Sequence, residues 1–176
     1  MMYSPARYSK YLVYMACVQI VLLLGACSGE APPAQPVEPS ADTFCTLDGM
    51  SLADYPGPKA QIFYGNDPPV FFCDTVEMFA MILGPESQRH IRAVFTQDMA
   101  KTGWEHPHGN WIDARTAFYV VGSQKNGSMG PTFASFAQRA DAGSFAGKYG
   151  GKVLAFSEVT PDMADLRGGA AHDTGM

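Results

Sequence analysis

The sequence predicts an α+β protein made of two small ββαβ-type halves that pack together. Short runs of β-branched and aromatic residues alternate with segments of helical period in the order strand, strand, helix, strand, and this order occurs twice. Hydrophobic residues make up 47% of the chain and charged residues 16%, which is typical of a chain that forms a core. The 176 residues suffice for two small halves that share one core.

The first half is assigned to residues 44–104. Its β-rich runs AQIFY and VFFC flank the turn sequence GNDPP, which predicts two neighbouring strands. Asp74 is a suitable N-cap for the helical pattern that follows, and Gly84-Pro85 ends that pattern. The predicted elements are therefore strands over 60–64 and 70–73, a helix over 76–83 and a strand over 91–96.

The second half is assigned to residues 105–161. A strand run over 113–122 is followed by the hairpin sequence QKNG, and Pro131 suits the start of a helix. The helical pattern runs from 133 to 149 with a break near 141–143, and a closing strand over 152–156 follows. An offset of 57 residues between the halves places Met129 opposite Phe72. Residues 162–176, rich in Gly, Ala and Asp, predict a flexible tail.

The N-terminus has the pattern of an export signal. Arg7 and Lys10 precede a stretch of 14 largely apolar residues, too short for a comfortable membrane-spanning helix, which ends in Leu-Gly-Ala-Cys27. This end resembles a bacterial lipobox and predicts a lipoprotein signal peptide over 1–26 with lipid attached to Cys27. A plain secretory signal is the alternative. Ser28 after the cysteine favours the outer membrane, and the Pro-rich residues 27–43 predict an extended tether.

Composition and motifs exclude several function classes. The net charge of −5 argues against nucleic acid as a partner, because phosphate binding needs clustered positive charge. The chain has no Gly-x-Ser-x-Gly elbow, P-loop, His-Glu-x-x-His or dinucleotide fingerprint, so it is not expected to be an enzyme.

Sulfur donors are the remaining chemical signal. Cys45 and Met50 lie five residues apart in a segment without regular period, and Met129 lies in the Gly-rich turn Ser-Met-Gly-Pro. Thiolates and thioethers are the donors that select Cu(I), although a methionine more often fills a gap in a core. Cys45 and Cys73 are the last two thiols of the mature chain, so a disulfide between them is the alternative. Two further residues, His106 and His108, form a weaker Cu or Zn signal.

Six segments in register resemble the NosL family, the lipoprotein copper chaperones for nitrous oxide reductase assembly. They are Cys45–Met50, Pro56–Gln61, Asp74–Phe79, Trp111–Arg115, Ser128–Thr132 and Gly150–Leu154. The resemblance implies a fold shared with the organomercurial lyases and Cu(I) bound by Cys45 and Met129, with Met50 as a third ligand. It also implies transfer of the copper to an ABC-type assembly complex and then to the reductase. The chain departs from the family pattern at Cys73, where Asp is common.

The expected protein is thus a Cu(I) metallochaperone anchored by lipid on the periplasmic side of the envelope, at the outer membrane. The alternative is a copper-free docking lipoprotein of the same assembly system with a Cys45–Cys73 disulfide. An organomercurial-cleaving enzyme using Cys45, Cys73 and Asp74 is a third hypothesis, which rests on fold analogy alone.

Overall fold

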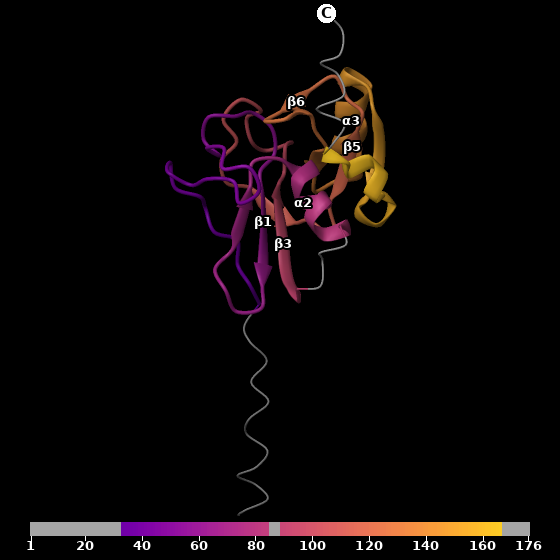
Figure 1. The fold of residues 1–176 in the computed structure, drawn as a ribbon. Helices are drawn as coiled ribbons and strands as arrows, with labels where there is room; N and C mark the ends of the chain where they lie inside the picture. The colour runs from indigo at the N-terminus through magenta and orange to yellow at the C-terminus, as the bar shows by residue number, and fades with distance from the viewer. Residues whose placement is uncertain (1–32, 85–88, 167–176) are drawn as a thin grey trace, which may run out of the picture. The chain divides into compact units, whose positions relative to one another are not determined.

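The computed structural model describes residues 33–84 and 89–166, and Figure 1 shows their arrangement. The first half contains β1 (Ala60–Tyr64), β2 (Val70–Phe72), α2 (Thr75–Leu83) and β3 (Ile91–Gln97), followed by β4 (Trp111–Asp113). The second half contains β5 (Phe118–Val121), β6 (Asn126–Gly127), β7 (Gly130–Pro131), β8 (Ala134–Phe136), α3 (Arg139–Tyr149) and β9 (Lys152–Ala155). Two short 3₁₀ helices follow, η1 (Phe156–Glu158) and η2 (Pro161–Ala164).

The two main sheets repeat one topology. The first has the strand order β2-β1-β3-β4 and the second the order β8-β5-β9, with antiparallel pairing throughout. In each half the first strand is central, the strand directly before the helix pairs on one side, and the strand after the helix pairs on the other. The predicted α+β class with a repeated ββαβ order is therefore confirmed.

The equivalence of positions between the halves differs from the prediction. By topology β2 corresponds to β8 and α2 to α3, whereas the offset of 57 aligns Phe79 of α2 with Phe136 of β8. Met129 is therefore not the counterpart of Phe72. It lies instead in an additional hairpin, β6–β7, between β5 and β8. The offset fails because the loop between the first two strands is longer in the second half.

The predicted helix start in the second half is also wrong. Pro131 lies in β7, the buried residues 134–136 form β8, and α3 begins only at Arg139. The helix continues through 141–143, where a break was predicted. Gly143 is tolerated because a helix interior accepts glycine at a cost of about 1 kcal/mol. The helix ends at Gly150, whose N–H donates to the Ala146 carbonyl.

The two halves share a hydrophobic core. Phe79 of α2 is fully buried, and its ring centroid lies 4.8 Å from that of Tyr119 in β5 and 5.1 Å from that of Phe156 in η1. A second link is polar, because the buried hydroxyls of Thr96 in β3 and Ser135 in β8 lie 3.0 Å apart. These contacts fix the second half against the helix that carries part of the candidate site.

The ordered domain extends beyond the predicted boundaries at both ends. Residues 34–43, assigned to the tether, belong to the same compact unit as the rest of the domain. The backbone of Val37 pairs with the side chain of Gln61 in both directions, at 2.9 Å each. At the other end, η2 forms where the tail was predicted to begin, and it packs near α2.

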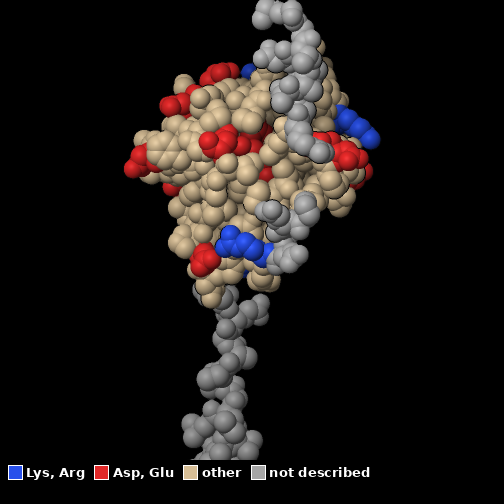
Figure 2. All heavy atoms as spheres, in the orientation of Figure 1, with Lys and Arg blue, Asp and Glu red and all other residues tan. Residues whose placement is uncertain are grey.

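The predicted signal peptide and the lipid-bearing Cys27 lie outside the described residues, as does most of the predicted tail. Among residues 33–84 and 89–166, no helix is both long and apolar enough to cross a bilayer. Acidic side chains outnumber basic ones on the face shown in Figure 2, in keeping with the net charge of −5.

Candidate metal centre

The loop that carries Cys45 is closed by its own backbone. The Cys45 N–H donates to the Met50 carbonyl at 2.8 Å, and the Gly49 N–H donates to the Cys45 carbonyl at 3.0 Å. Gly49 has a φ of +76°, a left-handed conformation that glycine adopts without steric cost. The Thr46 N–H donates to the Phe71 carbonyl at 2.8 Å, so the loop is attached to β2.

The junction between β2 and α2 supplies the other side of the site. Cys73 directly follows β2, and Asp74 caps α2 by accepting from the Val76 N–H at 2.9 Å. Glu77 lies in the first turn of the helix, where an acidic residue is favoured by the helix dipole. Because the cap fixes the angle between strand and helix, the side chains of Cys73 and Glu77 face the Cys45 loop.

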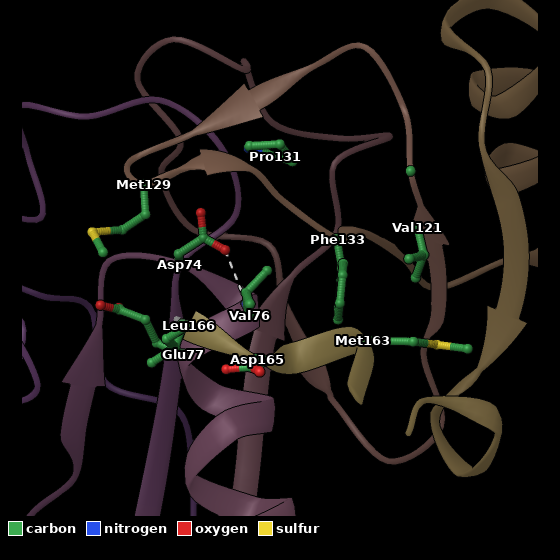
Figure 3. A pocket seen from close by; sticks show the side chains of 11 residues that line it. Asp74, Val76, Glu77, Val121, Met129, Pro131, Phe133, Met163, Asp165 and Leu166 are labelled. Atoms are coloured by element: carbon green, nitrogen blue, oxygen red, sulfur yellow. Dashed lines mark hydrogen bonds between the residues drawn. The ribbon is translucent and has the colours of Figure 1, made fainter. Parts of the chain in front are cut away.

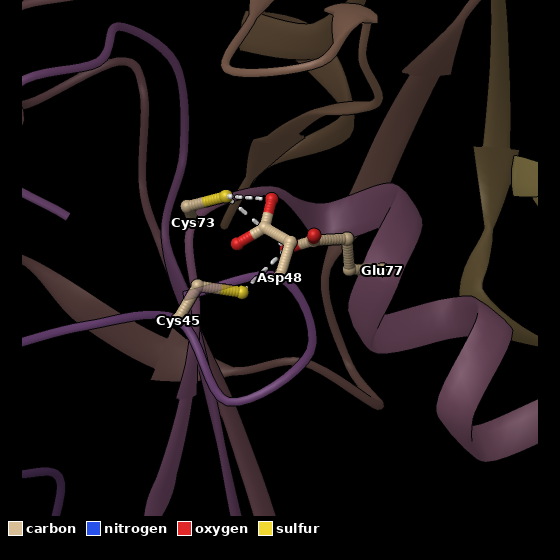
Figure 4. A group of neighbouring side chains, drawn as sticks. All are labelled: Cys45, Asp48, Cys73 and Glu77. Atoms are coloured by element: carbon tan, nitrogen blue, oxygen red, sulfur yellow. Dashed lines mark hydrogen bonds between the residues drawn. The ribbon is translucent and has the colours of Figure 1, made fainter. Parts of the chain in front are cut away.

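These segments bring two thiols and two carboxylates together, as Figure 4 shows. Oε2 of Glu77 accepts from the Cys45 thiol at 3.2 Å and from the Cys73 thiol at 3.3 Å. The Cys73 thiol also lies 3.7 Å from Oδ2 of Asp48. One donor atom from each of the four residues lies within 4.8 Å of all the others. We call this group the thiol–carboxylate cluster; Cys45, Cys73 and Glu77 are buried in it and Asp48 is exposed.

The groups of the cluster shift one another's proton affinity. The Cys73 thiol beside Cys45 lowers the pKa of Cys45 to about 6, and the same contact together with burial raises the pKa of Cys73. Burial and the neighbouring Cys45 raise the pKa of Glu77 to about 8. At neutral pH these shifts favour a thiolate at Cys45, with the proton of the Cys45–Glu77 hydrogen bond held by the carboxyl group of Glu77. A thiolate is the form of cysteine that binds metal.

Lys59 supplies a buried positive charge behind the cluster. Its Nζ donates to the carbonyl oxygens of Tyr55 at 2.8 Å, Pro56 at 3.1 Å and Cys73 at 3.1 Å. The side chain is almost fully buried, and burial lowers its pKa while the neighbouring Cys73 and Asp74 oppose that shift. Lys59 thus holds the backbone of Cys73 and offsets the negative charge of the site.

The second half reaches the cluster through the β6–β7 hairpin. The Ser128 hydroxyl donates to the Cys73 sulfur at 3.0 Å. The next residue, Met129, is 47% exposed and lines a cavity of about 330 Å³ that Glu77 also lines (Figure 3). The remaining walls are mostly apolar and include Val121, Phe133, Met163 and Leu166. Glu77 therefore contacts the two thiols and also lines the cavity that Met129 lines.

The residues singled out in the sequence have different positions relative to this centre. Cys45 lies in the cluster, and Met129 lines the same cavity as Glu77 of the cluster. Met50 is half-buried and packs against the hydrophobic core that includes Cys45. Nδ1 of His108 lies 2.7 Å from Oε1 of Glu38, a residue of the segment 34–43.

The structure does not contain the alternative disulfide, because Cys45 and Cys73 are both free thiols. Two members of the cluster, Asp48 and Glu77, were missed by the sequence analysis. Asp48 lies within the Cys45–Met50 segment, and Glu77 lies one helical turn beyond Cys73. Their short distance in sequence from a cysteine was the one signal that pointed to them.

Comparison with known proteins identifies the family. The model of the NosL family matches residues 36–164. The chain belongs to the NosL family. It is 35% identical to the copper-binding lipoprotein NosL of Stutzerimonas stutzeri, with 90% of this chain and 87% of that protein covered, and 37% identical to that of Achromobacter cycloclastes, with 86% and 82% covered. The crystal structure of the copper chaperone NosL from Shewanella denitrificans matches with a TM-score of 0.72 at 35% identity, covering 74% of this chain and 99% of that one.

The centre lies wholly within the NosL match, which includes Cys45, Cys73, Glu77 and Met129. Its donor set suits a soft metal ion, because thiolate and thioether sulfurs select Cu(I). Within the described residues, the buried Oε1 of Glu77 has no hydrogen-bond partner. A buried carboxylate oxygen without a partner is unfavourable unless something else binds there, and a metal ion would satisfy it.

Proposed function

We propose that this protein is a copper-binding lipoprotein that carries one Cu(I) for the maturation of nitrous oxide reductase. The observation that carries the proposal is the convergence of two buried thiols and the Glu77 carboxylate within 4.8 Å, beside a cavity lined by an exposed methionine. The likeness to copper-binding lipoproteins of the NosL family supports the identity of the metal.

In this proposal Cys45 provides the thiolate and Met129 the thioether from the other half, with Met50 as the third ligand. Cys73 lies close enough to provide a second sulfur, and Glu77 to provide an oxygen. Cu(I) prefers soft sulfur donors over carboxylates, so the sulfurs are the primary ligands.

A carrier must also release its cargo. Because the ligands come from both halves, a partner that moves the β6–β7 hairpin away from α2 would remove the thioether and weaken the site. The proposed recipient is an ABC-type assembly complex, which passes copper to the reductase. Lipid on Cys27 would hold the protein on the periplasmic side of the envelope, at the outer membrane. The related proteins are described as copper-binding lipoproteins and chaperones, in agreement with a role other than catalysis.

A Cu(I) competition titration against a strong chelator, with the purified and reduced domain, tests the proposal. Cys45→Ser should lower the Cu(I) affinity by two orders of magnitude or more, because it removes the anionic ligand. Met129→Leu should lower it by roughly tenfold, in the range found when a single supporting group of a metal site is removed.

Met163→Leu is the matched control for Met129→Leu. Met163 is 41% exposed and lines the same cavity, but its side chain points away from Glu77 (Figure 3). The control should bind Cu(I) as the wild type does. An unchanged affinity in Cys45→Ser would remove the thiolate from the proposal, and equal effects of the two methionine variants would remove Met129 as a specific ligand.

A further inference from the structure

A short polar bridge joins the helix that carries Glu77 to the hairpin that carries Met129. The Thr132 hydroxyl, one residue beyond β7, donates to Oδ1 of Asp74 at 2.6 Å. The same oxygen accepts from the Val76 N–H at 2.9 Å and so caps α2. One carboxylate therefore joins the start of α2 to the second half. Asp74 and Thr132 are both 1% exposed.

Neighbouring contacts make this bridge rigid. The Thr75 hydroxyl donates to the Phe133 carbonyl at 2.7 Å and lies 3.3 Å from the Thr132 hydroxyl. Gly127 packs so closely against Asp74 that a Cβ there would overlap Oδ2 of the carboxylate and lie 2.9 Å from Cβ of Thr132. The base of the hairpin is thus held from two directions, while its tip, at Ser128 and Met129, faces the cluster and the cavity.

The bridge lies close in the chain to the proposed ligands of both halves. In the chain, Asp74 lies between Cys73 and Glu77 of the cluster, and Thr132 lies three residues after Met129. The bridge is therefore a second link between the donors of the first half and the Met129 hairpin, beside the direct hydrogen bond from the Ser128 hydroxyl to the Cys73 sulfur. Unlike that bond, it is fully buried and joins the base of the hairpin to the start of α2. Metal affinity depends on how well surrounding groups hold the ligands in place, and loss of such a group lowers affinity by about 10–100-fold.

We propose that Asp74 and Thr132 are positioning residues for metal binding, which hold the Met129 hairpin at a fixed distance from the thiol–carboxylate cluster. This inference rests on the proposed function, because it gives Met129 the role of a ligand. If the bridge only stabilised the fold, its loss would weaken the contributions of all ligands to metal binding equally. A positioning bridge instead makes the contribution of Met129 depend on the Thr132 hydroxyl.

A double-mutant cycle separates these possibilities. Thr132→Val removes the hydroxyl and keeps the shape of the side chain. It should weaken Cu(I) binding about tenfold, as Met129→Leu does, and the double variant should be no weaker than either single one. Thr132→Ser restores the hydroxyl and should restore affinity. X-ray absorption at the copper edge should count one sulfur neighbour fewer in copper-loaded Thr132→Val than in wild type.

Thr96→Val is the matched control, because Thr96 is also a buried threonine whose hydroxyl links the two halves: it contacts the Ser135 hydroxyl and the Lys59 carbonyl but no residue of the cluster. It should leave the Cu(I) affinity and the sulfur count unchanged. Additive losses in the double variant, or an unchanged sulfur count in Thr132→Val, would overturn the positioning role and leave Met129 as a ligand. No effect of Met129→Leu in the wild-type background would instead overturn the ligand assignment of the proposed function, and the inference with it.

Discussion

The side chains of Cys45 and Glu77 are neighbours, and the usual order of their pKa values is reversed. The pKa of Cys45 is lowered to about 6 by the Cys73 thiol, and the pKa of Glu77 is raised to about 8 by burial and by Cys45. A lowered thiol pKa means that the thiolate forms as the pH rises through about 6, two to three pH units before an ordinary cysteine ionises. The cluster therefore carries a thiolate at neutral pH.

Ultraviolet thiolate absorbance of the reduced, metal-free domain should accordingly show one thiolate with a midpoint near pH 6. The second thiol should stay protonated at neutral pH, because the pKa of Cys73 is raised. Cys45→Ser should abolish the transition near pH 6. A wild-type domain whose thiols both ionise only above about pH 8 would contradict the assignment of the thiolate to Cys45.

The sequence analysis considered the sulfur atoms near the candidate site but not its carboxylates. Cys45 and Met129 were predicted as ligands because soft donors are few and their chemistry is distinctive. Glu77 was not, because a glutamate in the first turn of a helix is explained by the helix dipole alone. Only the fold shows that the capped helix turns this side chain toward both thiols. The low pKa of Cys45 likewise depends on Cys73, which is 28 positions away in the chain.

At the scale of elements, the first half was predicted well and the second half poorly. The strands AQIFY and VFF and the helix after Asp74 have strong local signals, and each forms close to its predicted bounds. In the second half, β8 has three residues and α3 has no clear apolar face, with Ala142 its one buried residue. Pairing with β5 forms β8, and local pattern does not contain that information.

The β6–β7 hairpin carries the proposed ligand Met129, and Gly127 tests how the hairpin packs. Gly127→Ala should destabilise the domain by about 1–3 kcal/mol and weaken Cu(I) binding, because the new methyl group would push the hairpin away from Asp74 and Thr132. Chemical denaturation and the competition titration measure the two effects.

Gly143→Ala is the control for a glycine substitution as such. Gly143 lies in the exposed part of α3, and a Cβ there would meet nothing within 4 Å. The change should stabilise the domain by about 0.5–1 kcal/mol, since alanine is the better helix former, and leave Cu(I) binding unchanged. A Gly127→Ala domain with wild-type stability and affinity would show that the hairpin tolerates displacement.

At the scale of the whole molecule, residues 34–43 are part of the folded domain. Glu38 connects this segment to the loop before β4: its carboxylate accepts from the Trp111 indole N–H at 2.6 Å and from the Gly109 N–H at 3.1 Å, and it pairs with His108. Composition could not predict this, because a Pro-rich segment without large apolar residues has the pattern of a free tether. Its attachment comes from polar contacts with residues some 70 positions away.

Glu38→Ala should therefore lower the free energy of unfolding by about 1 kcal/mol, a modest value because the carboxylate is partly exposed. Amide hydrogen exchange should become faster at Val37 and Gly109, since the contact that orders both segments is lost. Glu105→Ala is the matched control: Glu105 pairs with Lys125 at 3.5 Å but is 72% exposed, and such pairs add little stability. Equal stability of the two variants, with unchanged protection at Gly109, would show that the contacts of Glu38 do not stabilise the domain. The folded domain would then begin after residue 43.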